Sequence, residues 1–308
     1  MANLRDIKRR ISSVRNTTKI TRTMELIATA KSQVAMGRIR KALPYFHALA
    51  EIASQARRAG GSEELLHPLL EVREVKRVAV LVVVANRGLC GGYNTNAMRV
   101  ARDHRQALLD AGKEVRLFVS GKKGVNWARF QKIPVEQSYT QFDDKPGFGE
   151  VEQVADTLIG MFLRGEVDRV DVVYTHYFSA GRQAPVSETM LPITPSEHAE
   201  EGTHEAVSLK KERSEADARA ASEVNFIIEP DPTTILDALF PLQAKLHLFR
   251  VYLEAATSEQ IARRVAMKNA TENATEVGRA LKMAYNRARQ TQITNQILEV
   301  LGGAEALA

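Results

Sequence analysis

From Leu242 to Leu301 the chain reads LQAKLHLFRVYLEAATSEQIARRVAMKNATENATEVGRALKMAYNRARQTQITNQILEVL, without proline and with one glycine, Gly278. As one α-helix, these 60 residues would extend roughly 90 Å, since each residue adds about 1.5 Å. Helices of globular domains are several times shorter. The stretch therefore predicts a helix that reaches far beyond a single compact domain.

The N-terminal end has the same character. No proline occurs before Pro44, which is expected to kink or end the helix, and Gly37 is the one glycine in this stretch. The first apolar positions have the 3-4 spacing of a coiled-coil seam: Leu4, Ile7, Ile11, Val14 and Thr18. The seam positions that follow are offset: Ile20, Met24, Ile27, Lys31 and Val34. This offset predicts a shift of register around Thr17–Thr21.

A second seam with 3-4 spacing runs through the C-terminal stretch: Val277, Leu281, Ala284, Ala288, Thr291, Asn295 and Leu298. Its small residues would let another helix approach closely. Two such seams at opposite ends of the chain predict a long antiparallel coiled coil of the N- and C-terminal helices, with Ile7–Val34 beside Val265–Leu298. We assign these helices to residues 1–57 and 233–301.

Between the two helices, residues 75–229 alternate strand-like and helix-like segments. The first strand, Arg77–Ala85, is β-branched and almost wholly apolar, as expected of a strand buried on both faces. Further strands are predicted at Val115–Ser120, Ile133–Tyr139, Arg169–Phe178, Ala184–Ile193 and Asn225–Ile228, and helices at Thr95–Ala111, Lys123–Gln131 and Val151–Arg164. This alternation indicates parallel βαβ units, so the fold class is α/β, a Rossmann-like domain plus the coiled coil. Within this domain, Pro195–Glu223 predicts a mobile excursion, because it has almost no large apolar residues.

The distribution of charge points to an acidic partner. The chain has 308 residues and a formal net charge of +6. Residues 1–41 hold eleven Lys and Arg against two acids, whereas residues 196–223 hold eight acids against four bases. A basic helix attracts nucleic acid, anionic lipid or an acidic protein surface. The single cysteine, Cys90, excludes a disulfide within the sequence, and the longest apolar run, Val78–Ala85, is too short to span a membrane.

Two glycine-containing stretches bear on nucleotide binding. Ser120-Gly-Lys-Lys-Gly124 lacks the first glycine of a phosphate loop, and Lys123 occupies the position of the Ser or Thr that binds magnesium. Gly88, Gly91 and Gly92 follow a strand and precede a helix, but their spacing is not that of a dinucleotide site. We interpret both stretches as turns.

No metal site or catalytic constellation is evident in the sequence. The seven histidines form no H-x-x-x-H or H-E-x-x-H pattern. Cys90 has no partner nearby in the sequence, so a structural thiol is favoured over a nucleophile. We expect this thiol to be able to face outward from a sharply bent turn, and a buried thiol is the alternative. A long helical shaft beside an α/β domain suits mechanical or scaffolding work better than an active-site cleft. Two alternatives to this function stay open, a nucleotide-binding α/β enzyme and a basic coiled-coil binder of nucleic acid. Against the second, no aromatic platform and no DNA-binding motif accompanies the basic helices.

Three motifs carry a resemblance to a known family. Residues 17–31 read TTKITRTMELIATAK, residues 87–92 read RGLCGG, and residues 267–271 and 285–299 read MKNAT and YNRARQTQITNQILE. In order and separation these motifs resemble those of the gamma subunit of the rotary proton-translocating ATP synthase, across essentially the whole chain. Asn86 departs from the family, which commonly has Asp at this position. The acidic stretch Pro195–Glu223 is also longer than usual.

The resemblance implies the central stalk of that complex, a rotor that couples proton flow to conformational cycling of the catalytic beta subunits. The coiled coil would lie inside a ring of alternating alpha and beta subunits, and the α/β body would lie against the epsilon subunit and the membrane c-ring. The resemblance implies that Met24, Arg87 and Cys90 lie near the acidic lever loop of beta. It also implies that Arg289, Gln290 and Thr294 make polar contacts with beta loops higher in the cavity.

The resemblance also implies what the chain lacks. The catalytic groups of the family are on alpha and beta, so no catalytic residue, cofactor or metal is expected here. The chain is expected to be a peripheral membrane protein on the cytoplasmic face of the bacterial inner membrane, and not to bind nucleic acid.

Overall fold

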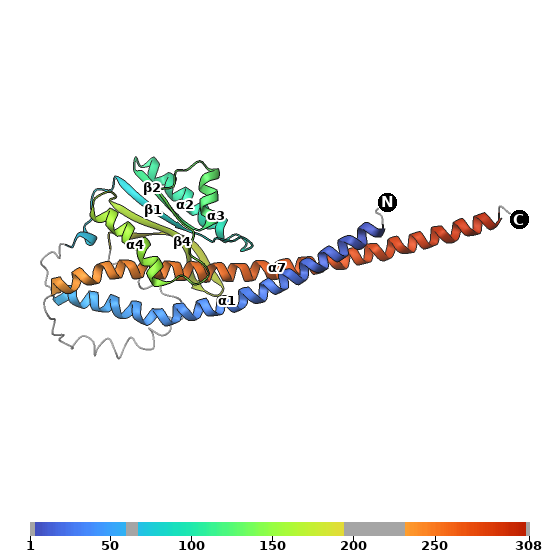
Figure 1. Cartoon of the computed structure of the whole chain (residues 1–308), viewed down its shortest axis with the longest axis horizontal. Coiled ribbons are helices and arrows are strands. Elements are labelled where there is room, and N and C mark those ends of the chain that lie inside the picture. Colours follow the sequence, from blue (N-terminus) through green and yellow to red (C-terminus); the bar gives the residue numbers. More distant parts are fainter. Residues whose placement is uncertain (1–3, 60–66, 194–231, 306–308) are drawn as a thin grey trace. The chain divides into compact units, whose positions relative to one another are not determined.

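The computed structural model describes residues 4–59, 67–193 and 232–305. Contacts divide the chain into two compact units, which we call the helical unit (Met1–Thr29 with Arg263–Ala308) and the body (Ala30–Ala262). Two long helices, α1 (Leu4–Ala59) and α7 (Pro232–Glu305), contribute residues to both units (Figure 1). The expected strand Asn225–Ile228 and the expected excursion Pro195–Glu223 lie outside the described residues.

Helices α1 and α7 pair in antiparallel orientation in the helical unit. The hydroxyl of Thr271 donates to Thr21 Oγ1 at 2.8 Å, and a Cβ placed on Gly278 would lie 3.6 Å from Val14 Cγ1. Residues nearer the N-terminus of α1 therefore pair with residues nearer the C-terminus of α7. The predicted antiparallel coiled coil is confirmed, and its register places Leu4 opposite Ala288.

The seam of α1 keeps one register along its length. Leu4 to Thr18 follow the expected spacing, and the most buried positions after them are Thr21, Ala28, Ser32, Ala35 and Ile39. The predicted shift of register is wrong, because Ile20, Ile27 and Val34 are all at least half exposed, at 60%, 51% and 50%. Small residues at a helix contact let the two backbones come close, so the bulkier neighbours stay outside.

The predicted seam of α7 is partly wrong for the same reason. From Thr271 to Ala288 the less exposed positions are Thr271, Ala274, Gly278, Leu281, Tyr285 and Ala288. Leu281 and Ala288 were predicted, whereas Val277 and Ala284 are exposed and lie one residue away from the seam. All residues from Arg289 to Gly302 are exposed, which includes Thr291, Asn295 and Leu298 of the predicted seam. The register explains this, since the described part of α1 begins opposite Ala288.

The body contains a five-stranded sheet in the order β3-β2-β1-β4-β5. The strands are β1 (Arg77–Val83), β2 (Glu114–Ser120), β3 (Gln137–Tyr139), β4 (Arg169–Ser179) and β5 (Arg182–Leu191). Strands β1 to β4 are parallel, as the alternating pattern predicts, and β5 closes the edge antiparallel to β4. Strand β3 is shorter than the predicted Ile133–Tyr139.

Helices cover both faces of this sheet (Figure 1). On one face α2 (Tyr93–Asp110) and α3 (Lys122–Phe130) pack against the side of β1 that carries Val78, Val80 and Val82. On the other face α4 (Phe148–Leu163), the 3-10 helix η1 (Pro68–Leu70) and the first part of α7 pack against Ala79, Leu81 and Val83. Burial on both faces accounts for the continuous apolar sequence of β1.

Two prolines lie inside long helices. Pro44 does not end α1, and Pro241 lies inside α7, although an internal proline costs about 3 kcal/mol in a helix. Packing in the body offsets this cost. Around Pro44, Ile39, Leu43 and Phe46 belong to an apolar cluster with α7, and around Pro241 the core takes Leu236, Phe240 and Ala244. None of the described helices has the length and apolarity needed to cross a membrane.

Candidate subunit-interface residues

Met24 lies in the helical unit at the border of the seam. Its side chain is partly exposed, and the register of the pair puts it opposite Lys268 of α7. On the outer surface nearby, Ile20 and Leu26 are 60% and 58% exposed. This level of the helical unit therefore presents apolar side chains to its surroundings.

Arg289, Gln290 and Thr294 lie in the same unit on the last part of α7. All three side chains are exposed. At 1.5 Å per residue, Arg289 lies about 32 Å further along α7 than Lys268. The helical unit thus carries two separate levels of candidate contact residues.

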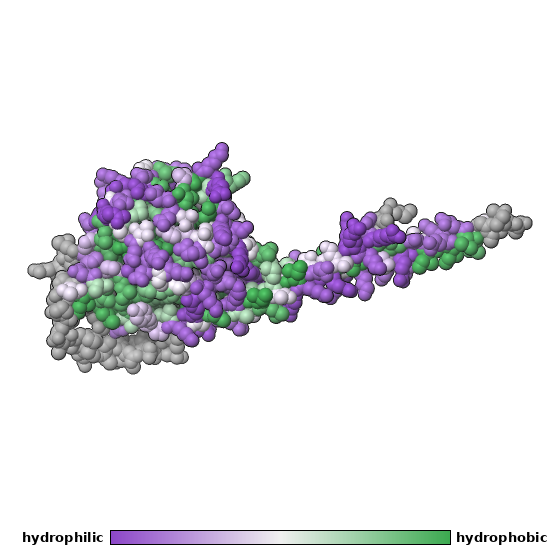
Figure 2. All heavy atoms as spheres, viewed as in Figure 1, coloured by the Kyte–Doolittle hydropathy of each residue, from purple (hydrophilic) through white to green (hydrophobic). Residues whose placement is uncertain are grey.

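The last part of α7 also exposes large apolar residues. The exposed fractions run from 47% for Ile293 to 72% for Val300, and the other members are Ile297, Leu298 and Leu301. Figure 2 shows hydrophobic residues on this part of α7, just before its C-terminal end. Apolar side chains that recur along a solvent-exposed helix mark a surface for a protein partner.

Arg87 and Cys90 lie in the body, in the turn between β1 and α2. The backbone is left-handed at Leu89 (φ 62°) and at Gly91 (φ 57°), so the turn reverses direction sharply. Arg87 and Leu89 are exposed, but Cys90 is only 2% exposed. The expected outward-facing thiol is therefore wrong: the two left-handed residues turn Cys90 into the body.

The thiol of Cys90 has polar neighbours inside the turn. Its Sγ lies 3.1 Å from Asn94 Nδ2 and 3.8 Å from the carbonyl oxygen of Arg87. Ala85 and Tyr93 pack around it. Cys90 thus supports the turn from inside, while the turn presents Arg87 and Leu89 to solvent.

Asn86 binds three backbone groups. Its side-chain nitrogen donates to the carbonyl oxygens of Thr140 and Phe142, at 3.1 and 2.6 Å, and its side-chain oxygen accepts from the N–H of Lys122 at 2.9 Å. An aspartate could accept from Lys122 but could not donate to the two carbonyls. Asn86, at the position where the family commonly has Asp, therefore makes contacts that need a side-chain amide.

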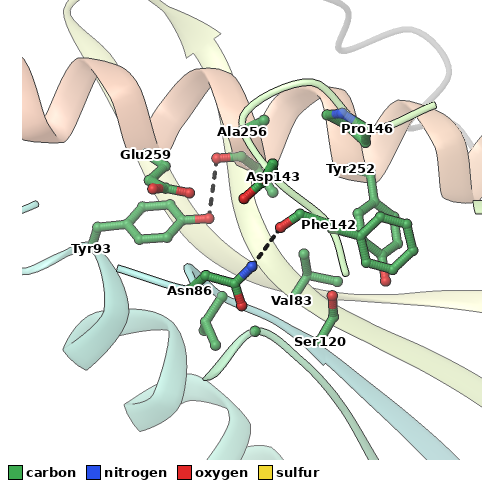
Figure 3. Close-up of a pocket in the computed structure, with 13 residues that line it drawn as sticks. Val83, Asn86, Tyr93, Ser120, Phe142, Asp143, Pro146, Tyr252, Ala256 and Glu259 are labelled. Atoms are coloured by element: carbon green, nitrogen blue, oxygen red, sulfur yellow. Dashed lines mark hydrogen bonds between the residues drawn. The ribbon is translucent and has the colours of Figure 1, made fainter. Parts of the chain in front are cut away.

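A phosphate would bind the backbone N–H groups at the start of a helix. In α2 and α3 these groups already donate to acceptors of the chain itself. At α3, the N–H of Lys122 is bound by Asn86 and that of Lys123 by the carbonyl of Ala85. At α2, the N–H of Tyr93 is bound by the carbonyl of Cys90. A pocket at the ends of β1 and β2 has a volume of about 30 Å³, far below that of typical ligand sites (Figure 3).

The structure shows one polar site in the body that sequence analysis missed. The loop Thr140–Gly147 between β3 and α4, which we call the strap, contacts both long helices. Asp144 binds Lys31 of α1 and Gln260 of α7. These residues are more than a hundred positions apart in sequence, so no local pattern could have brought them together.

A second missed site is a partly buried charged cluster between the sheet and α7. It consists of Tyr174 and His176 of β4, Glu188 of β5, and His247, Arg250 and Glu254 of α7. Glu254 binds His176 Nδ1 at 2.5 Å and Arg250 Nε at 3.2 Å, and Glu188 accepts from the Tyr174 hydroxyl at 2.9 Å and lies 3.5 Å from His247. Burial lowers the pKa of His247, whereas the pKa of Arg250 is raised because Glu254, Tyr174 and Glu188 outweigh its burial.

Comparisons with known proteins agree with this architecture. The sequence matches the family model described as ATP synthase over residues 3–307. It is 41% identical to the ATP synthase gamma chain of Rhodopirellula baltica over 100% of this chain and 99% of that protein, and 38% identical to that of Leptospira biflexa over 100% of both.

Solved structures show the same fold at lower identity. The Euglena gracilis mitochondrial ATP synthase, in its OSCP/F1/c-ring assembly, has a chain with a TM-score of 0.62 and 18% identity, over 99% of this chain and 94% of that chain. The Tetrahymena thermophila central stalk and c-ring structure has a chain with a TM-score of 0.54 and 18% identity, over 82% and 99%.

A mostly parallel five-stranded sheet together with the antiparallel pair of α1 and α7 defines an α/β fold with a long helical pair, and the solved chains share this fold. The family model and the relatives then identify the family. The chain belongs to the ATP synthase gamma chain family.

Proposed function

We propose that the chain is the central rotor shaft of an ATP synthase, coupling proton flow through the membrane sector to conformational cycling of the catalytic beta subunits. The observation that carries this proposal is the match to gamma chains over the whole length of both proteins. The antiparallel pair supports it, since two packed helices form the stiff element that a shaft requires. In this role the chain is a non-catalytic subunit that serves ATP synthesis and hydrogen ion transport.

The asymmetry of the helical unit provides the physical basis of coupling. Up to Ala288 the unit contains two paired helices, and beyond it α7 continues to Glu305 without a partner among the described residues. Three beta subunits around such a shaft would contact different surfaces at any moment. Differences in contact free energy then favour a different conformation in each beta subunit, and turning the shaft moves each through its affinity states.

We infer that the two levels of the helical unit contact beta. Met24 and the exposed apolar residues near it form one level. Arg289, Gln290 and Thr294 form the other and make polar contacts with beta loops. From the body, Arg87 meets an acidic loop of beta, and Cys90 contributes by holding the turn that presents Arg87. The exposure of Arg87 and of the α7 residues supports this assignment.

The remaining partners in this role are the alpha subunits, the epsilon subunit and the c-ring. The Tetrahymena thermophila central stalk, whose fold this chain shares, was solved with its c-ring, which supports that contact. The chain is then a peripheral membrane protein, and its place is the cytoplasmic face of a bacterial inner membrane.

Affinity purification of the chain from its own cells tests the proposal. Alpha, beta, epsilon and c subunits should co-purify with it, and the assembly should hydrolyse ATP while the isolated chain does not. Purification of the chain without alpha and beta, or ATP hydrolysis by the isolated chain, would overturn the proposal.

A further inference from the structure

The strap is fixed to the sheet at its first residues. Asn86, which follows β1, donates to the carbonyls of Thr140 and Phe142 at 3.1 and 2.6 Å. The ring of Phe142 packs on that of Tyr252, with centroids 4.4 Å apart. Figure 3 shows the contact of Asn86 with Phe142 and the neighbouring ring of Tyr252. The start of the strap is therefore held by the sheet edge on one side and by α7 on the other.

The later residues of the strap bind both long helices. Asp144 Oδ1 accepts from Gln260 Nε2 of α7 at 2.7 Å, and Asp144 Oδ2 forms an ion pair with Lys31 Nζ of α1. Arg38 of α1 donates to the carbonyl oxygen of Pro146 at 2.7 Å. One carboxylate thus joins α1, α7 and the strap.

The positions of these contacts along the helices matter. Lys31 is the second residue of the body on α1, and Gln260 is the third from its end on α7. The strap therefore binds each helix within one turn of the point where that helix passes from the body into the helical unit.

Apolar packing holds α1 and α7 together in the body, where Ile39, Leu253 and Ile261 belong to one buried cluster. Interdigitated side chains already restrict the angle between packed helices, and the polar contacts of the strap add to this restraint. Charge-assisted hydrogen bonds depend on direction and position. A carboxylate that binds both helices at the end of the body is placed to resist their twisting.

We propose that Asp144 is a positioning residue that transmits torque between the body and both helices. The proposal rests on the proposed rotor function. Lys31 and Asp144 are partly exposed, with side-chain exposed fractions of 40% and 27%, so the ion pair contributes little to folding. Its loss should change coupling more than stability.

Membrane vesicles that carry the complete ATP synthase test this proposal. ATP-driven proton pumping and ATP hydrolysis are measured in the same vesicles. The ratio of pumping to hydrolysis falls when hydrolysis proceeds without moving protons. Asp144→Ala should keep hydrolysis and lower the ratio by about twofold or more, because both helix contacts are lost. Asp144→Asn, which keeps an acceptor for Gln260, should lower it less. The control Asp103→Ala removes an exposed carboxylate from α2 and should leave the ratio unchanged.

Exchange of the pair provides a rescue test. Lys31→Asp alone places two carboxylates together and should lower the ratio. Combining it with Asp144→Lys should restore the ratio. In this double variant the new amine can also donate to Gln260 Oε1, which is buried without a partner among the described residues. If Asp144→Ala fails to assemble, Asp144→Asn and Lys31→Gln decide the question. A wild-type ratio in the Asp144 variants, or no recovery in the exchanged pair, overturns the proposal. Wild-type vesicles that neither hydrolyse ATP nor pump would instead refute the rotor function itself.

Discussion

Asn86 connects three segments of the body through one amide. It holds two carbonyls of the strap and the first N–H of α3. Asn86→Asp keeps the size of the side chain but turns two donated bonds into contacts between oxygen atoms. The bond to Thr140 is exposed and the bond to Phe142 is partly buried, so each lost hydrogen bond costs about 0.5–1.5 kcal/mol, and the free energy of unfolding should fall by about 1–3 kcal/mol for the two together.

Urea unfolding of the purified chain measures this change. The matched control is Asn126→Asp, since Asn126 is exposed on α3 and the same charge is added there. The control should unfold at nearly the wild-type urea concentration. Equal midpoints for the two variants would show that the amide contacts of Asn86 do not stabilise the body.

Cys90 shows what a local sequence can and cannot predict at this scale. The run Gly88 to Gly92 correctly predicts a sharp turn after a buried strand. The orientation of the thiol depends on left-handed backbone at Leu89, which is a residue that rarely adopts it, and on Asn94 of the next helix. Neither of these is visible in the glycine spacing, so the prediction of an outward thiol failed.

At the scale of elements, the periodic patterns predicted nearly all helices and strands and the antiparallel pairing. They failed by one residue on part of each seam, after Thr18 in α1 and at Val277 and Ala284 in α7. The structure instead brings Thr21 to Thr271 and Val14 to Gly278, where small side chains allow close approach.

Cysteine cross-linking tests this register. Thr21→Cys with Thr271→Cys, and Val14→Cys with Gly278→Cys, should each form a disulfide on mild oxidation, since a disulfide needs Cα atoms within about 7 Å. The control pair Val14→Cys with Thr271→Cys is displaced by about 10 Å along the helix and should not. Native Cys90 is buried and can stay. A cross-link in the displaced pair, without one in the matched pairs, would contradict the register.

The charged cluster predicts a loss of stability in acid. Burial lowers the pKa of His247 in the folded chain. When the pH falls below the ordinary histidine pKa of about 6.5, the unfolded chain therefore binds more protons than the folded chain, and the unfolded state is favoured. Burial alone would raise the pKa of Glu188, but His247, Arg250 and the Tyr174 hydroxyl together hold it below its ordinary value. Its contribution is therefore present above that value and is lost at lower pH.

Urea midpoints at about pH 7.5 and about pH 5.5 separate the two groups, because only histidines titrate in that interval. Wild-type chain should be less stable at the lower pH. His247→Gln cannot be protonated in this range and should lose less stability on acidification. Equal losses in the variant and in wild type would show that His247 does not contribute to the acid sensitivity.

At the scale of the whole molecule, the sequence motifs identified the family, but the strap could not be predicted. Lys31, Asp144 and Gln260 are contributed by three elements that are distant in the chain. A polar contact of this kind leaves no periodic pattern, because each residue alone looks like an ordinary charged or polar surface residue.

Rotation of the chain within its complex tests the central claim most directly. A complex of alpha and beta with the chain is fixed to a surface through beta, and a bead is attached to Asp103→Cys, since Asp103 is exposed on α2 and Cys90 is buried. With ATP, the bead should turn in one direction, with three pauses per turn, one for each beta subunit. ATP hydrolysis at a normal rate with a stationary bead would contradict the rotor account.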